Sequence, residues 1–163
     1  MSFLITDKNI TDALFILNNL RDEDREEVSL IYGEDWLKKA LSSSMSSDFS
    51  IMKIITHKGT RPFAMGGVCP LEGNPKIGCV WLLSTPEVQQ HQIPLLRTLK
   101  RYTEEFDSEF DLTYNYIYKK NHLAKNWLKW LGYRFDNPHP TWAEYSDDFE
   151  YFYRLRKDNI LCA

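Results

Sequence analysis

The chain contains 163 residues and carries a formal net charge of −3; 43% of its residues are hydrophobic, 26% are charged and 14% are aromatic. This balance is typical of a soluble globular protein and excludes disordered and collagen-like chains, and no apolar run approaches the ~20 residues of a membrane span. The weak negative charge argues against nucleic acid as a partner of the whole surface. Because ~150 residues per domain is usual, the length predicts a single domain over residues 1–163.

Signals for export are not visible in the sequence. The N-terminal residues MSFLITDKNI lack a basic segment and a long apolar segment, so we expect no secretion signal. Three scattered cysteines fit a reducing compartment better than a disulfide framework. These features predict a cytoplasmic protein without a membrane partner.

The first part of the chain is expected to be mainly helical. FLI near the N-terminus favours a short strand, and apolar residues then recur at helical spacing over 10–20, behind a cap at Thr6 or Asp7. Residues 22–45 continue the helical pattern. Acidic residues are concentrated in the first turn of this segment, where the helix dipole favours them. Gly33 is expected to interrupt the helix.

Strand patterns follow this helical region. Residues 49–57 and 62–69 predict a hairpin around a turn at Gly59, with the second strand ending at Pro70. Residues 71–78, LEGNPKIG, are rich in turn formers and are expected to form a loop. The nearly continuous apolar run CVWLLST at 79–85 predicts a central strand that is buried on both faces of a sheet.

The next segments predict a helical crossover between two strands. LTYNYIY at 112–118 is strongly β-forming, and the segment before it has an apolar face with helical spacing. The residues of that face are Leu95, Leu99, Tyr102 and Phe106. Because a helix joins them, strands 79–85 and 112–118 are expected to be adjacent and parallel.

A short helix with clear limits comes next. Asn121 is its predicted N-cap and Gly132 its stop, with an apolar face formed by Leu123, Ala124, Trp127, Leu128 and Leu131. Lys125 and Lys129 are expected to face away from that stripe, where they form a solvated helix face or contact an anionic partner. Residues 133–135, 141–145 and 149–156 predict two or three closing strands.

The order of these elements resembles the GNAT N-acetyltransferase superfamily. The segment 121–135, NHLAKNWLKWLGYRF, is similar to that family's late signature of Asn, Ala three residues on, and Leu-Gly-aromatic at the helix end. PFAMGGV at 62–68 looks like the family's third strand. The resemblance implies an α/β fold, in which a single GNAT-like domain has a mixed β-sheet flanked by helices. It implies acetyl-CoA as the cofactor of any activity, bound at Trp81, Leu82, Leu83 and Asn121 if the site is retained.

Within this superfamily the chain looks most like the small internal virion proteins of short-tailed bacteriophages. The segments that carry this likeness are PFAMGGVC, VWLLSTPEV and the TYNYIY strand before the Asn121 helix. This resemblance implies a location in the virion and the host bacterial cytoplasm, with other phage or host proteins as partners. A bacterial acetyltransferase is the main alternative.

The connection that holds the cofactor's pyrophosphate in that family differs here. The family uses an RxxGxG/A pattern, because backbone N–H groups converge on an anion only where glycine lets the chain turn closely. This chain reads STPEVQQHQIPLL and has no glycine between Gly78 and Gly132. Pro86 and Pro94 lack N–H groups, and Glu87 adds a repulsive charge. Three side chains could donate instead, although a solvated loop residue is the commoner role for each: Gln89, Gln90 and His91.

The proton donor of the family also has no counterpart. The family often places a Tyr seven residues after the signature Asn, and Leu128 stands there in this chain. Three tyrosines on the preceding strand could substitute, but an aromatic ladder is the commoner arrangement at this spacing: Tyr114, Tyr116 and Tyr118. Glu144 is a candidate general base with no geometry to support it. No catalytic residue is assigned, and the histidines and cysteines lack the spacing of a metal site.

The sequence therefore leaves two functions open. The first is a GNAT-fold protein with a degenerate acetyl-CoA site and no cofactor, which acts as a structural or interaction protein of the virion or its assembly. The second is an active acetyl-CoA-dependent N-acetyltransferase that modifies a protein or a small-molecule amine. Fold alone does not separate them, because one fold supports many functions.

Overall fold

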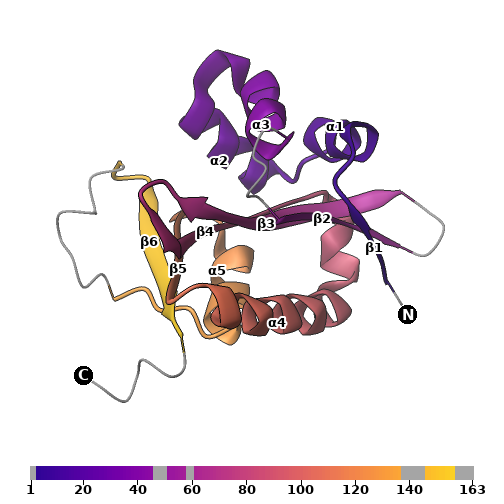
Figure 1. Cartoon of the computed structure of the whole chain (residues 1–163). Coiled ribbons are helices and arrows are strands. Elements are labelled where there is room, and N and C mark those ends of the chain that lie inside the picture. The colour runs from indigo at the N-terminus through magenta and orange to yellow at the C-terminus, as the bar shows by residue number, and fades with distance from the viewer. Residues whose placement is uncertain (1–2, 46–50, 58–60, 137–145, 157–163) are drawn as a thin grey trace. The chain divides into compact units, whose positions relative to one another are not determined.

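The computed structural model describes residues 3–45, 51–57, 61–136 and 146–156 and contains one mixed β-sheet with helices (Figure 1). The strands are β1 (Phe3–Asp7), β2 (Ile51–His57), β3 (Pro62–Leu71), β4 (Asn74–Ser84), β5 (Leu112–Tyr118) and β6 (Phe149–Leu155). The helices are α1 (Ile10–Asn18), α2 (Asp22–Tyr32), α3 (Trp36–Met45), α4 (Gln92–Glu109) and α5 (His122–Trp130), with 3₁₀ helices η1 (Gly33–Asp35) and η2 (Pro86–Gln90).

The six strands are hydrogen-bonded in chain order, β1-β2-β3-β4-β5-β6. The pairs β1–β2, β2–β3 and β5–β6 are antiparallel, and β4–β5 is parallel with Ile77 opposite Leu112 and Cys79 opposite Tyr114. This confirms the predicted parallel crossover. The chain forms two compact units, residues 1–69 with 81–95 and residues 70–80 with 96–163, called here the first and the second unit.

The first unit is built around a helical core on strands β3 and β4. Ala13, Ile16 and Leu17 of α1 are fully buried and pack with Met65 of β3 and Leu83 of β4. The structure corrects the predicted cap of α1, which is Asn9 and not Thr6 or Asp7; both of those residues belong to β1. The Asn9 side chain accepts a hydrogen bond from the N–H of Asp12 at 2.9 Å.

Strand β4 begins earlier than the sequence indicates. Residues 71–78 were predicted to form a loop, but only the two residues between β3 and β4 form the turn. Residues 74–78 are strand, since Ile77 and Gly78 pair with β5 and the carbonyl of Lys76 accepts the N–H of Asp111 at 2.8 Å. Pro75 lies near the exposed start of the strand, which is one of the places where sheets tolerate proline.

The second unit places α4 and α5 on one face of β5 and β6. Arg154 of β6 forms an ion pair with Asp107 of α4, and Lys125 of α5 forms one with Glu150 of β6. Trp127 of α5 is 5% exposed, which confirms its predicted core position. The predicted cap at Asn121 and stop at Gly132 are also confirmed, with Gly132 at a φ of +90°.

The basic face of α5 was only partly predicted. Lys125 is not simply a solvated side chain: its ammonium pairs with Glu150 and lies 5.8 Å from the ring centre of Phe135. Lys129 lies 5.6 Å from the same ring centre. Leu131 is half-buried rather than fully buried.

The closing strand predicted at 149–156 is β6. The predicted strand at 141–145 and the predicted turn at 58–59 lie outside the described residues.

No helix in the described segments combines the length and the hydropathy that crossing a membrane requires.

Candidate functional site

Three of the four residues predicted to contact a cofactor, Trp81, Leu82 and Leu83, lie on the last part of β4, in the first unit. Leu83 is buried in the helical core, and Trp81 packs against the same core. Leu82 therefore points to the opposite face, because neighbouring strand residues alternate. A Cβ on Gly66 of β3 would lie 2.5 Å from the carbonyl oxygen of Trp81, so glycine is required for this close approach. Whether these residues contact a cofactor stays a prediction.

A buried ionic cluster, which was not predicted from the sequence, fixes the end of β4. Asp24 of α2 accepts hydrogen bonds from the N–H and the hydroxyl of Ser84, each at 2.9 Å. The Arg21 guanidinium donates to the Asp24 carboxylate at 2.5 and 3.2 Å, and the Arg21 N–H donates to the Ser84 carbonyl at 2.9 Å. All three residues are nearly inaccessible to solvent. The start of α2 is thereby attached to the last residue of β4.

The connection after β4 is a 3₁₀ turn. It begins at Thr85, whose N–H donates to the carbonyl of Phe63 at 2.8 Å. The Val88 N–H donates to the Thr85 carbonyl, and the His91 N–H donates to the Val88 carbonyl. Pro86 occupies the first turn of η2 and has no N–H. The N–H groups of Val88 and His91 are therefore already bonded within the turn.

His91 is not the solvated loop residue that the sequence suggested. Only 7% of its surface is exposed, and its ring centre lies 5.4 Å from that of Phe63 and 6.0 Å from that of Phe3. Its Nε2 is 3.8 Å from a carboxylate oxygen of Glu87. His91 is therefore part of the aromatic packing beneath the connection. Gln89 and Gln90 are exposed, as predicted.

The fourth predicted contact, Asn121, lies in the second unit. Its side chain accepts a hydrogen bond from the N–H of Ala124 at 3.4 Å, and its own N–H donates to the Tyr118 carbonyl at 2.9 Å. It is 2% exposed and acts as the helix cap. A role in cofactor binding remains a prediction.

A side chain of β5 engages the backbone of β4 where the parallel pairing ends. The Asn115 amide donates to the carbonyl of Val80 at 2.7 Å, immediately after the last recorded pair, Cys79 with Tyr114. Its carbonyl oxygen accepts the N–H of Tyr116 at 2.7 Å. The Val80 carbonyl is thus already occupied by a protein donor. The sequence analysis missed Asn115, although a polar residue inside a β-forming run is a visible signal.

The tyrosines of β5 form the predicted ladder, extended across β6. Tyr114 and Tyr116 lie 5.9 and 5.4 Å from Tyr151 between ring centres, and Tyr118 lies 6.1 Å from Phe149. Burial raises the pKa of Tyr114, with smaller contributions from Cys79 and Tyr116. Burial also raises the pKa of Tyr151. The Tyr114 and Tyr151 hydroxyls are therefore weaker acids than free tyrosine, so neither is adjusted toward proton donation to a thiolate.

Leu128, which the resemblance sets at the position of the family's proton donor, has no acidic group. Leu128 is half-buried on α5, between the buried Trp127 and the exposed Lys129. The candidate base Glu144 lies outside the described residues. The described part of the chain thus contains a structural cap, a strand end and an aromatic ladder, and no acid–base pair is identified among its residues.

No protein-family model matches the chain, and no curated protein matches its sequence. Solved structures match over nearly their whole length. A spermidine N-acetyltransferase SpeG chimera from Vibrio cholerae and hSSAT has 11% identity and a TM-score of 0.70, with 98% of this chain and 99% of that chain covered. A GNAT-family acetyltransferase from Streptococcus pneumoniae has 12% identity and a TM-score of 0.61, with 94% and 99% covered.

A third structure was solved in complex with coenzyme A. It is the PaiA N-acetyltransferase from Thermoplasma acidophilum, with 11% identity, a TM-score of 0.63, and coverage of 95% of this chain and 99% of that chain. These similarities confirm the predicted α/β GNAT fold. At such identities they establish the fold alone.

The ionic cluster at Ser84 yields a stability prediction. Asp24→Ala leaves the buried Arg21 charge without its carboxylate, so we expect a loss of roughly 3 to 5 kcal/mol in the free energy of unfolding. Asp22→Ala, an exposed position in the same first turn, is the control and should change it by less than about 1 kcal/mol. Urea denaturation measures both. Equal effects would show that the cluster does not hold the strand end.

The buried hydroxyl of Tyr133 yields a pH prediction. Burial raises its pKa from 10.0 to about 12, and the hydrogen bond from Thr113 and the nearby Arg154 only partly oppose this. The folded state keeps the proton longer than the unfolded state, so this stabilisation is complete below pH 10 and is lost as the pH rises to about 12. The loss is roughly 3 kcal/mol. In Tyr133→Phe, denaturation across this range should show a correspondingly flatter pH dependence; an unchanged slope would contradict the assignment.

Proposed function

We propose that this chain is a GNAT-fold protein with a degenerate acetyl-CoA site, which acts as a structural or interaction protein of a bacteriophage virion or its assembly. The observation that carries the proposal is the connection from Thr85 to His91. Its N–H groups at Val88 and His91 donate within the 3₁₀ turn, Pro86 has none, and Glu87 carries a negative charge. A pyrophosphate would meet repulsion and few free donors there.

Two further features support the loss of the site. The carbonyl of Val80, at the end of the β4–β5 pairing, already accepts a hydrogen bond from Asn115. Leu128 stands where the family often has its proton donor, and burial raises the pKa values of Tyr114 and Tyr151. Binding of the cofactor and protonation of its thiolate would both need groups from elsewhere. The affiliation with phage virion proteins rests on the sequence resemblance.

The alternative is an active acetyl-CoA-dependent N-acetyltransferase. It is supported by the solved structures of the same fold, which are N-acetyltransferases, one of them in complex with coenzyme A. In that case acetyl-CoA would supply the acyl group. The backbone of Trp81, Leu82 and Leu83 would contact the cofactor, and Asn121 would lie near it as part of the α5 cap. The acceptor amine would belong to a protein or a small molecule.

Acetyl-CoA binding separates the two functions. A ligand at 100 times its dissociation constant that binds only the folded state stabilises it by about 2.7 kcal/mol, which raises the melting temperature by several degrees. We expect no resolvable shift at millimolar acetyl-CoA and no release of CoA with a lysine-rich peptide mixture. Leu128→Tyr should not restore activity, because it supplies an acid but no phosphate contacts. A saturable shift with amine-dependent CoA release would establish the enzyme.

Virion association is a separate prediction. Mass spectrometry of purified particles from the phage that encodes the chain should detect it at a constant ratio to the capsid proteins, and the ratio should survive nuclease and gradient purification. A soluble cytoplasmic phage enzyme is the control for carry-over. Enrichment no greater than this control would reject the virion role whatever the result with acetyl-CoA.

A further inference from the structure

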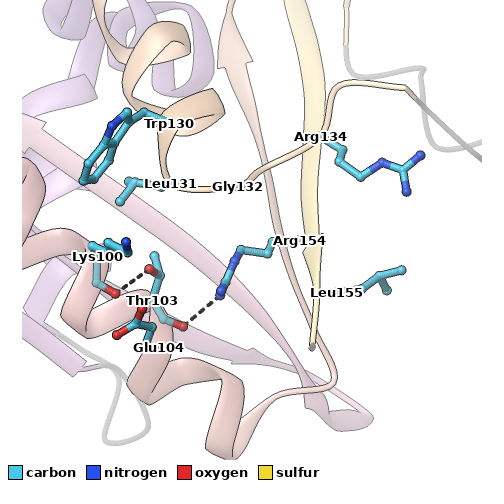
Figure 2. Close-up of a pocket in the computed structure, with 9 residues that line it drawn as sticks. All are labelled: Lys100, Thr103, Glu104, Trp130, Leu131, Gly132, Arg134, Arg154 and Leu155. Carbon is cyan, nitrogen blue, oxygen red and sulfur yellow. Dashed lines mark hydrogen bonds between the residues drawn. The ribbon is translucent and has the colours of Figure 1, made fainter. Parts of the chain in front are cut away.

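The second unit contains an open pocket of about 290 Å³ between α4, the end of α5 and β6 (Figure 2). None of the predicted cofactor contacts lines it. The side chains that bear on its chemistry are Lys100, Glu104, Trp130, Leu131 and Arg154, and Gly132 lies beside them. Figure 2 shows Trp130, Leu131 and Gly132, at the end of α5 and just after it, above Lys100, Thr103 and Glu104 of α4, with Arg154 extending from β6 toward α4.

A buried guanidinium forms the base of the pocket. Arg154 is 8% exposed, and its two terminal nitrogens are held by Asp107, one at 2.8 Å, and by the Thr103 carbonyl at 2.9 Å. Its Nε–H has no acceptor among the residues that the structure describes. The Nε lies 3.5 Å from where a Cβ on Gly132 would be, so the absence of a side chain at Gly132 leaves this donor open to the pocket.

The rim carries one charge of each sign. Lys100 and Glu104 are one helical turn apart on α4, and both are exposed. In the described part of the chain no ion pair joins them; instead the Lys100 ammonium lies 5.6 Å from the ring centre of Trp130. Arg134, which also lines the pocket, is paired with Asp136. An ammonium and a carboxylate therefore remain available beside the free Nε–H of Arg154.

The wall of the pocket is apolar and accessible. Trp130 is 54% exposed, an unusual position for an indole, and Leu131 adjoins it. The volume lies just below the range of roughly 300–1,000 Å³ that is usual for drug-sized ligands, which suits a smaller molecule of about ten to fifteen heavy atoms. A fitting ligand combines a carboxylate, an ammonium and an apolar group within this size.

We propose that this pocket binds a free α-amino acid with an apolar or aromatic side chain. The carboxylate accepts hydrogen bonds from the Arg154 Nε–H and the Lys100 ammonium, which are charge-assisted and therefore strong. The ammonium of the ligand pairs with Glu104. The side chain packs on Trp130 and Leu131, where aromatic surface adds favourable contact energy. Binding here requires neither acetyl-CoA nor any residue of the candidate cofactor site.

The test uses L-phenylalanine as the probe and the full chain labelled with ¹⁵N. Titration at millimolar concentrations should shift the Arg154 Nε–H resonance and the Trp130 indole N–H resonance along one saturable curve. Arg154→Lys and Trp130→Phe identify the two resonances by their loss. If neither resonance moves, or if both move linearly without saturation, the site does not exist.

Matched variants on α4 test the two charges. Lys100→Met and Glu104→Gln should each weaken binding roughly tenfold. Arg101→Met and Glu105→Gln, which change the adjacent exposed residues outside the pocket, should leave the affinity unchanged. All four positions are exposed, so the fold is expected to survive each change. Equal weakening by the controls would show that binding follows the general charge of α4 and would overturn the proposal.

Two blocked probes distinguish a free amino acid from the end of a peptide. N-acetyl-L-phenylalanine keeps the carboxylate and lacks the ammonium, and L-phenylalaninamide has the opposite change. Both should bind roughly tenfold more weakly than L-phenylalanine. If the acetylated probe binds equally well, the pocket accepts a peptide C-terminus and Glu104 has no role; if the amide does, a peptide N-terminus is accepted and the Arg154 contact is wrong.

Discussion

The first unit depends on the way the Asp24 carboxylate is satisfied inside the protein. A buried charge is costly unless it is paired and hydrogen-bonded, and Asp24 has both the Arg21 guanidinium and two donors of Ser84. Because the Arg21 N–H returns a bond to the Ser84 carbonyl, α2 and the end of β4 cannot move independently. The turn that follows therefore starts from a fixed point, which is also anchored by the bond from Thr85 to Phe63.

The elements that the sequence predicted well are those whose signals are local. The cap at Asn121, the stop at Gly132 and the apolar face around Trp127 all lie within one short segment, so periodicity was sufficient. Residues 74–78 were missed because turn formers dominate the local sequence, while the pairing that makes them a strand comes from β5. Asp24 looked like an ordinary first-turn acid because its partner Ser84 is 60 residues away.

The sequence alone shows where the candidate site differs from the family pattern. It does not show which contacts the residues of the site make. The prolines of the connection, Glu87 and Leu128 can be read directly from the sequence. His91 was expected in solvent because its neighbours are polar, yet Phe3 and Phe63 bury it. The occupation of the Val80 carbonyl by Asn115 likewise depends on the register of two strands. Local sequence thus showed which residues differ from the family pattern, and tertiary structure shows which contacts the residues present here make.

In the second unit, ion pairs help to fix the register of β6. The face of β6 under the helices carries Glu150 and Arg154, which pair with Lys125 of α5 and Asp107 of α4, and between them the buried Phe152 packs against Tyr133 and Phe135. The opposite face carries Tyr151 and the rest of the aromatic ladder. A slip of one residue would exchange the faces and leave Lys125 and Asp107 without their counter-charges on β6. The ion pairs therefore exclude the slipped arrangement, and this same constraint brings the Nε of Arg154 beside Gly132.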